Sequence, residues 1–84
     1  MQMTPVQSSN IHSIGHDGAD TYVTFKNKDG SPASTYRYAG VPAEKHAELA
    51  AADSVGKHLN AHFRGQHEAT KLDTTLTPPP ETVS

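Results

Sequence analysis

The sequence predicts a small α+β domain in which a three-stranded antiparallel β-meander is followed by two α-helices packed on one face of the sheet. Three observations predict this order. Residues 21–26 alternate between the two faces of a strand with a period of two. The strands follow one another without an intervening helix, and strands that are consecutive in the chain usually pair with one another. Residues 43–52 are rich in alanine, the residue with the highest helix propensity.

The first strand is predicted over residues 10–15. Ile11 and Ile14 are three positions apart, so a regular strand would place them on opposite faces of the sheet. We expect a β-bulge, or the end of the strand at Gly15, to bring both isoleucines into the core.

The second and third strands are predicted over residues 21–26 and 35–38, joined by a long polar loop at residues 27–34. Tyr22 and Arg37 fall on the outer face, which such a sheet can leave open to solvent as a binding platform. The other face is expected to enter the core and carries Thr21, Val23, Phe25, Tyr36 and Tyr38.

Two helices are predicted after the strands. Pro42 is suited to the first position of a helix over residues 43–52. Ser54 is a good N-cap for a second helix, and Gly65 is a plausible C-cap for its end.

Composition limits the function. The 84 residues suffice for one domain, the formal net charge is −2, and there is no cysteine. A basic excess typical of DNA-binding proteins is missing. The sequence contains no apolar run of membrane-spanning length and no signal-peptide pattern, so we expect a cytoplasmic protein. We also expect a monomer. Residues 1–7 are expected to be flexible, and the Thr/Pro-rich residues 71–84 to form a disordered tail.

The order of several short motifs resembles the KTSC domain, named for its occurrence at the C-terminus of some lysyl-tRNA synthetases. The resemblance covers about residues 6–67 and implies a domain over residues 8–70. Its motifs are Ser8-Ser9-Asn10-Ile11, Ile14-Gly15-His16-Asp17, Tyr22-Val23-Thr24-Phe25, Tyr36-Arg37-Tyr38, Val41-Pro42, Ser54-Val55-Gly56-Lys57-His58-Leu59-Asn60 and Phe63-Arg64.

The resemblance implies a stand-alone protein of bacterial or phage type. RNA binding is suggested for the family by the synthetase context, and the family has no assigned catalytic residues. This chain departs from the family pattern in its longer loop at residues 27–34. It also has histidine where relatives usually have tyrosine or phenylalanine, at His16, His46, His58 and His67.

The predicted start of the second helix is a candidate anion site. Ser54, Gly56 and Lys57 combine free backbone N–H groups, a small residue and a cation, and helix N-termini attract phosphate. The alternative is an ordinary capped helix. For nucleic acid, Arg64, Arg37 and Tyr22 are the further candidates, because guanidinium groups bind phosphate and aromatic rings stack on bases.

Two catalytic interpretations are weaker. His58 and His62 are four residues apart and could share a helix face as zinc ligands, with His46 or His67 as a third. A Ser54–His58–Asp53 arrangement would compete with the capping role of Ser54. We therefore expect no enzyme activity, no metal and no cofactor. The function we expect first is nucleic-acid binding, with RNA as the preferred ligand. The alternative is a protein-interaction module or a small inhibitor. A metal-dependent activity at the histidine pair is a remote third.

Overall fold

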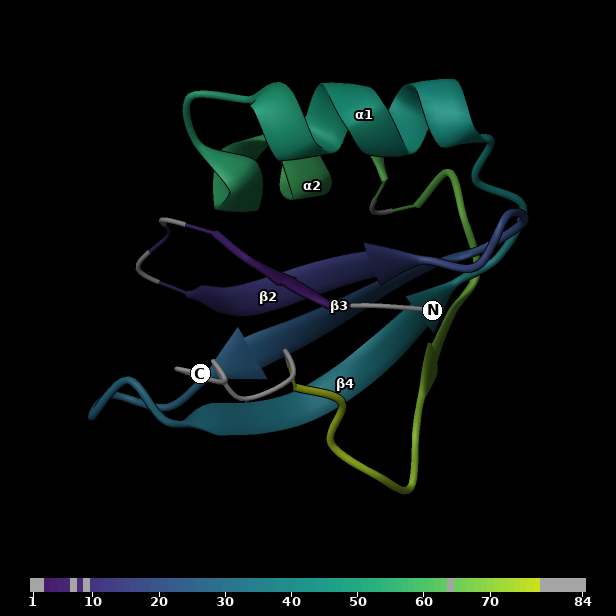
Figure 1. Cartoon of the computed structure of the whole chain (residues 1–84). Helices are drawn as coiled ribbons and strands as arrows, with labels where there is room; N and C mark the ends of the chain where they lie inside the picture. The colour runs from purple at the N-terminus through teal and green to yellow at the C-terminus, as the bar shows by residue number, and fades with distance from the viewer. Residues whose placement is uncertain (1–2, 7, 9, 64, 78–84) are drawn as a thin grey trace, which may run out of the picture.

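The computed structural model describes residues 3–6, 8, 10–63 and 65–77. Both helices lie on one face of a twisted sheet (Figure 1). The elements in chain order are β1 (Thr4–Pro5), β2 (Ile11–His16), β3 (Thr21–Lys26), β4 (Pro32–Tyr38), α1 (Ala43–Ala51), α2 (Val55–His62) and β5 (Ala69–Lys71).

The sheet has five antiparallel strands in the order β1-β2-β3-β4-β5. The α+β class and the central three-stranded meander are confirmed, but three strands understate the sheet. β1 has two residues and β5 three exposed ones, so neither carries the alternating pattern by which strands are identified. β4 also begins at Pro32, three residues earlier than predicted.

Of the two explanations considered for the first strand, the β-bulge is the one present, and the strand continues past Gly15 to His16. The register between β2 and β3 shifts between Ile11 and Ser13, which pair with Phe25 and Thr24. Because His12 is the extra residue, Ile11 and Ile14 both face the helices and are buried.

A second bulge lies between β3 and β4. Thr24 pairs with Thr35 and Lys26 with Pro32, so Phe25 stands opposite two residues, Ala33 and Ser34. A bulge disrupts the hydrogen-bond ladder locally and bends the strand that carries it.

The N-cap predicted at Ser54 is confirmed, whereas Pro42 and Gly65 lie just outside the helix positions predicted for them. α1 begins directly after Pro42, whose carbonyl accepts the N–H groups of Lys45 and His46 at 3.0 and 3.1 Å. Ser54 is the N-cap of α2, and its hydroxyl accepts the N–H of Lys57 at 3.4 Å. The C-cap of α2 is Phe63 and not Gly65 as predicted; Gly65 follows two residues later with a φ of +83°, a conformation that favours glycine. Within the described residues, neither helix has the length and apolar character needed to cross a bilayer.

One hydrophobic core lies between the helices and the inner face of the sheet. Phe63 and Tyr38 meet edge to face, with ring centroids 6.1 Å apart. Burial of each large apolar side chain contributes about 1.5–3 kcal/mol. The buried cluster comprises Ile11, Ile14, Val23, Tyr38, Val41, Leu49, Val55, Leu59 and Phe63.

The ends of the domain are more structured than expected. Thr4 and Pro5 pair with β2, and the predicted boundary at residue 70 falls inside β5. In place of the loose chain expected after it, residues 72–76, here called the strap, hydrogen-bond to β3 and β4 on the face opposite the helices. Figure 1 shows the chain turning back toward β4 after β5. Residues 78–84 of the predicted tail, and residues 1, 2 and 7 of the predicted N-terminal segment, lie outside the described residues.

Candidate binding groove

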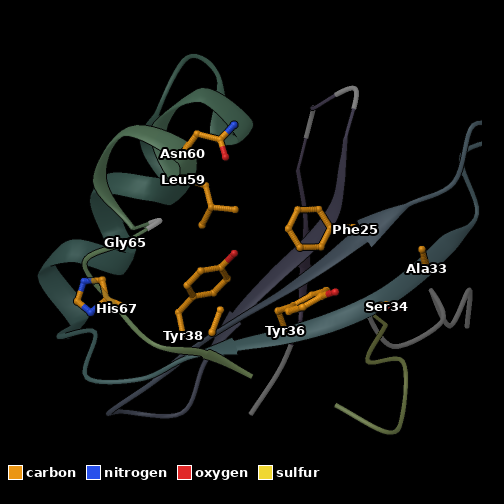
Figure 2. Close-up of a pocket in the computed structure, with 10 residues that line it drawn as sticks. Phe25, Ala33, Ser34, Tyr36, Tyr38, Leu59, Asn60, Gly65 and His67 are labelled. Atoms are coloured by element: carbon orange, nitrogen blue, oxygen red, sulfur yellow. The ribbon is translucent and has the colours of Figure 1, made fainter. Parts of the chain in front are cut away.

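A groove opens on the helix side of the sheet, between α2 and the strands β3 and β4. Its volume is about 560 Å³, within the roughly 300–1,000 Å³ of small-ligand sites. Figure 2 shows Leu59 and Asn60 on one side, facing Phe25 and Tyr36 on the other. The lining residues are Phe25, Ala33, Ser34, Tyr36, Tyr38, Leu59, Asn60, Gly65, His67 and Ala69.

Aromatic rings dominate the strand side of the groove. Phe25 and Tyr36 are half-buried and meet edge to face, with ring centroids 5.5 Å apart and an angle of 83° between their planes. The second bulge sets Phe25 against Ala33 and Ser34, whereas Tyr36 pairs in regular register with Val23. The groove therefore offers partly exposed π-surface for stacking.

A few polar groups accompany the rings. Ser34 and Asn60 contribute a hydroxyl and an amide to the lining. The His67 ring binds the carbonyl of Ala39 through Nδ1 at 3.0 Å, which assigns the proton to that nitrogen because a carbonyl can only accept.

Two lysines lie beside residues that line the groove. Its ten lining residues include no carboxylate. Lys57 and Asn60 are neighbours on the surface of α2 at i and i+3, while Lys71 of β5 stands opposite Tyr36. Both lysines are exposed, and so is Glu68, which lies between the lining residues His67 and Ala69.

The predicted outer-face pair has a different environment. Tyr22 and Arg37 are direct cross-strand partners. The Tyr22 hydroxyl donates to Asp17 Oδ2 at 3.0 Å, and Arg37 Nε lies 3.8 Å from Asp20 Oδ2. The Arg37 side chain is 43% exposed, so this ion pair is worth little in stability.

Asp17 organises the turn beside this pair. Its Oδ1 accepts the N–H groups of Asp20 and Ala19, at 2.7 and 2.9 Å. These backbone bonds lower the pKa of Asp17 to about 2, so it is an anion at neutral pH. Burial, followed by the hydrogen bond to Asp17, raises the pKa of Tyr22. The Tyr22–Arg37 pair therefore has a carboxylate beside each member, Asp17 and Asp20, which disfavours a phosphate there.

The start of α2 is packed against another segment. A Cβ at Gly56 would lie 3.5 Å from Ser8 Oγ and 4.0 Å from Asn10 Nδ2. The Ser8 hydroxyl turns back to accept the N–H groups of Asn10 and Ile11, as expected for a serine before a strand. These are ordinary van der Waals distances, so the start of α2 touches the chain before β2 without requiring glycine at position 56.

The six predicted site residues do not converge. Three of them lie on the helix side of the sheet, where the start of α2 touches the chain before β2: Ser54, Gly56 and Lys57. Two lie on the opposite face, beside the β2–β3 turn: Tyr22 and Arg37. Arg64 lies outside the described residues. Among these residues, Lys57 flanks the groove.

Comparison with known proteins identifies the family. A family model described as the KTSC domain matches residues 7–67. The crystal structure of a KTSC domain protein from Yersinia pestis is similar, with a TM-score of 0.74 and 32% identity, covering 84% of this chain and 96% of that one. This chain belongs to the KTSC domain family.

Two further relatives have no stated function. An uncharacterized protein of Stutzerimonas stutzeri is 36% identical over 67 residues, which is 80% of this chain and 90% of the relative. A protein of Tsukamurella paurometabola is 34% identical over 70 residues, 83% of this chain and 100% of the relative. The resemblance inferred from the motifs is confirmed.

The histidines of this KTSC domain form pairs. His58 and His62 share one side of α2, as their spacing predicts, with ring centroids 4.4 Å apart. His16 and His46 stack at 5.0 Å. No group of three or more metal-ligating side chains is found within residues 3–6, 8, 10–63 and 65–77.

The groove itself was not predicted from the sequence. Alternation correctly placed Phe25 and Tyr36 on the helix side, but it assigned them to the core. Their partial exposure depends on how far α2 extends across the sheet, which the sequence pattern does not report. The sequence feature that could have indicated the groove is the number of aromatic side chains on that face, since two short helices leave part of them uncovered.

Proposed function

We propose that this KTSC domain is a non-catalytic binding module whose groove takes an unpaired base of single-stranded nucleic acid, with RNA as the expected form. The observation that carries the proposal is the pair of half-buried rings, Phe25 and Tyr36, in a groove free of lining carboxylates. Single-stranded nucleic acids are bound by stacking their bases on aromatic side chains of such surfaces.

Phosphate contacts are assigned to Lys57 and Lys71, which flank the groove. Arg37 contributes less, because Asp17 and Asp20 lie beside it. With few cations and a net charge of −2, binding should be weak and only mildly sensitive to salt. The synthetase context of the family favours RNA over DNA.

The proposal includes no catalytic role. The Ser54 hydroxyl, the one nucleophile considered from the sequence, caps α2 by accepting the Lys57 N–H. A capping hydroxyl needs no neighbouring base, so this geometry supports a structural role for Ser54.

A protein-interaction role is the second candidate. The apolar side chains of Phe25 and Leu59 face each other across the groove, and the net charge is slightly negative. Such a groove can receive an apolar side chain of a partner protein, since aromatic residues are enriched at the centre of protein interfaces.

The two candidates can be separated by fluorescence anisotropy with a labelled eight-nucleotide uridine RNA at low salt. Tyr36→Leu keeps an apolar side chain and removes the aromatic face, so affinity should fall by about 1–3 kcal/mol. Tyr22→Leu, on the other face, is the matched control and should bind like the wild type.

Absence of RNA binding at low salt would reject the nucleic-acid proposal. A purified partner protein that binds the wild type and not Tyr36→Leu would then support the protein-interaction role.

A further inference from the structure

The bulged segment of β4 forms one wall of the groove. Ala33 and Ser34 are the two residues opposite Phe25, and both line the cavity. Because a bulge interrupts regular pairing, this wall receives less support from the β3 ladder than a regular strand would.

The strap supports this wall from the other face of the sheet. The Thr75 hydroxyl donates to the carbonyl of Ala33 at 2.8 Å. The N–H of Leu72 donates to the carbonyl of Thr35 at 2.9 Å, and that of Leu76 to the Thr35 hydroxyl at 2.8 Å. These bonds fall on the residues immediately before and after Ser34.

We infer that the strap is a positioning element of the groove: it fixes the Ala33–Ser34 wall and so sets the affinity of the site. The claim about affinity rests on the proposed function, which supplies the ligand. The claim that the strap fixes the wall does not depend on any ligand. The strap contacts Thr35 on the outer face, while Ser34 and Tyr36, its neighbours in the strand, line the groove on the inner face. A shift of the strap therefore moves groove residues without touching a ligand.

The strap also lies beyond the family match, which ends at residue 67. It bonds Thr35 through the N–H groups of Leu72 and Leu76, and it bonds Ala33, in the wall itself, through the Thr75 hydroxyl. The hydroxyl can be removed by one substitution that preserves shape, because valine has nearly the volume of threonine.

The test compares Thr75→Val with two controls in the full chain. Thr75→Ser keeps the hydroxyl, and Thr74→Val makes the same replacement at the neighbouring exposed threonine. Two quantities are measured at a temperature where every variant is folded: the NMR signals of the Phe25 and Tyr36 rings without ligand, and the affinity for the eight-nucleotide uridine RNA.

In Thr75→Val we expect the ring signals to shift or broaden and the affinity to fall about fivefold, as for the loss of one hydrogen bond. Thr75→Ser and Thr74→Val should resemble the wild type.

Unchanged ring signals in Thr75→Val overturn the inference, whether or not RNA binds. Changed ring signals in a protein that binds no RNA would leave the positioning role in place and reject the proposed ligand. Changed ring signals with RNA affinity within twofold of wild type would overturn the claim that the strap sets affinity.

Discussion

The hydroxyl oxygens of Thr24 and Thr35 lie 2.6 Å apart on the outer face of the sheet, and both residues are fully buried. The Thr24 hydroxyl donates to the carbonyl of Leu76 at 2.5 Å, and Thr35 Oγ1 accepts the N–H of Leu76 at 2.8 Å. Since Thr24 has one proton and gives it to Leu76, the proton between the threonines comes from Thr35. The three residues form a closed ring in which every donor has an acceptor.

Thr24→Val should break this ring. The Thr35 hydroxyl and the Leu76 carbonyl would each lose a partner, and leaving such groups buried costs about 1–3 kcal/mol. Urea denaturation should show a loss of this size in the free energy of unfolding. In Thr24→Val/Thr35→Val the unpaired Thr35 proton is gone, so the double substitution should cost less than the two single ones added together. Additive costs would mean that the two hydroxyls do not depend on each other.

Removal of residues 73–84 deletes the strap except for Leu72, whose N–H bonds Thr35. The sequence alone predicts that this deletion leaves the melting temperature nearly unchanged, because the segment is polar and rich in threonine and proline. The bonds from Thr75 and Leu76 to β3 and β4 predict a decrease. A loss of about 1 kcal/mol corresponds to roughly 4–8 °C in a domain of this size. A change below about 2 °C would favour the prediction from sequence.

Stability should decrease as the pH falls below about 6.5, the ordinary value for histidine. Burial, and next the adjacent His16, lower the pKa of His46 in the folded chain. Between the folded and unfolded values the unfolded chain binds more protons, so acidification favours unfolding until the folded pKa is reached. Urea denaturation at pH 7.5 and 5.5 measures the effect.

His46→Phe should flatten this pH dependence, even though it also removes the contact between His46 Nδ1 and the Thr21 hydroxyl at 3.1 Å. His62→Gln, at an exposed position on α2, is the control and should keep it. Equal slopes in the wild type and His46→Phe would show that His46 is not responsible.

The salt dependence of RNA binding tests the roles of Lys57 and Lys71. Each phosphate neutralised in a single strand contributes about 0.7 to the slope of log affinity against log salt. Lys57→Gln and Lys71→Gln should each reduce the slope by about that amount, while Lys45→Gln on α1 should not. A slope unaffected by either groove-side substitution would place the phosphate contacts elsewhere.

Local signals predicted the centre of this fold well. Alternation identified β3, the spacing of Ile11 and Ile14 indicated a bulge, and Ser54 was recognised as a cap from its residue type. Each of these features depends on a few consecutive residues, which a sequence displays directly.

The remaining features depend on contacts between distant segments. Residues 69–71 form a strand because β4 offers them a free edge, although all three are exposed. The strap is composed of residues typical of loops. Its hydrogen-bond partners include Thr24 and Thr35, which lie about forty to fifty positions earlier in the chain. The groove likewise depends on where α2 stops covering β3 and β4, so neither could be deduced from local patterns.

The lengths of the outermost strands also bear on aggregation. An open sheet edge can pair with the edge of another molecule, and proteins limit this with short edge strands, proline and lysine. β1 has two residues, one of them Pro5, which has no N–H to donate; β5 has three and ends at Lys71. The sheet therefore presents little continuous backbone to a second copy, which should help to keep the chains apart at high concentration even though their net charge is small.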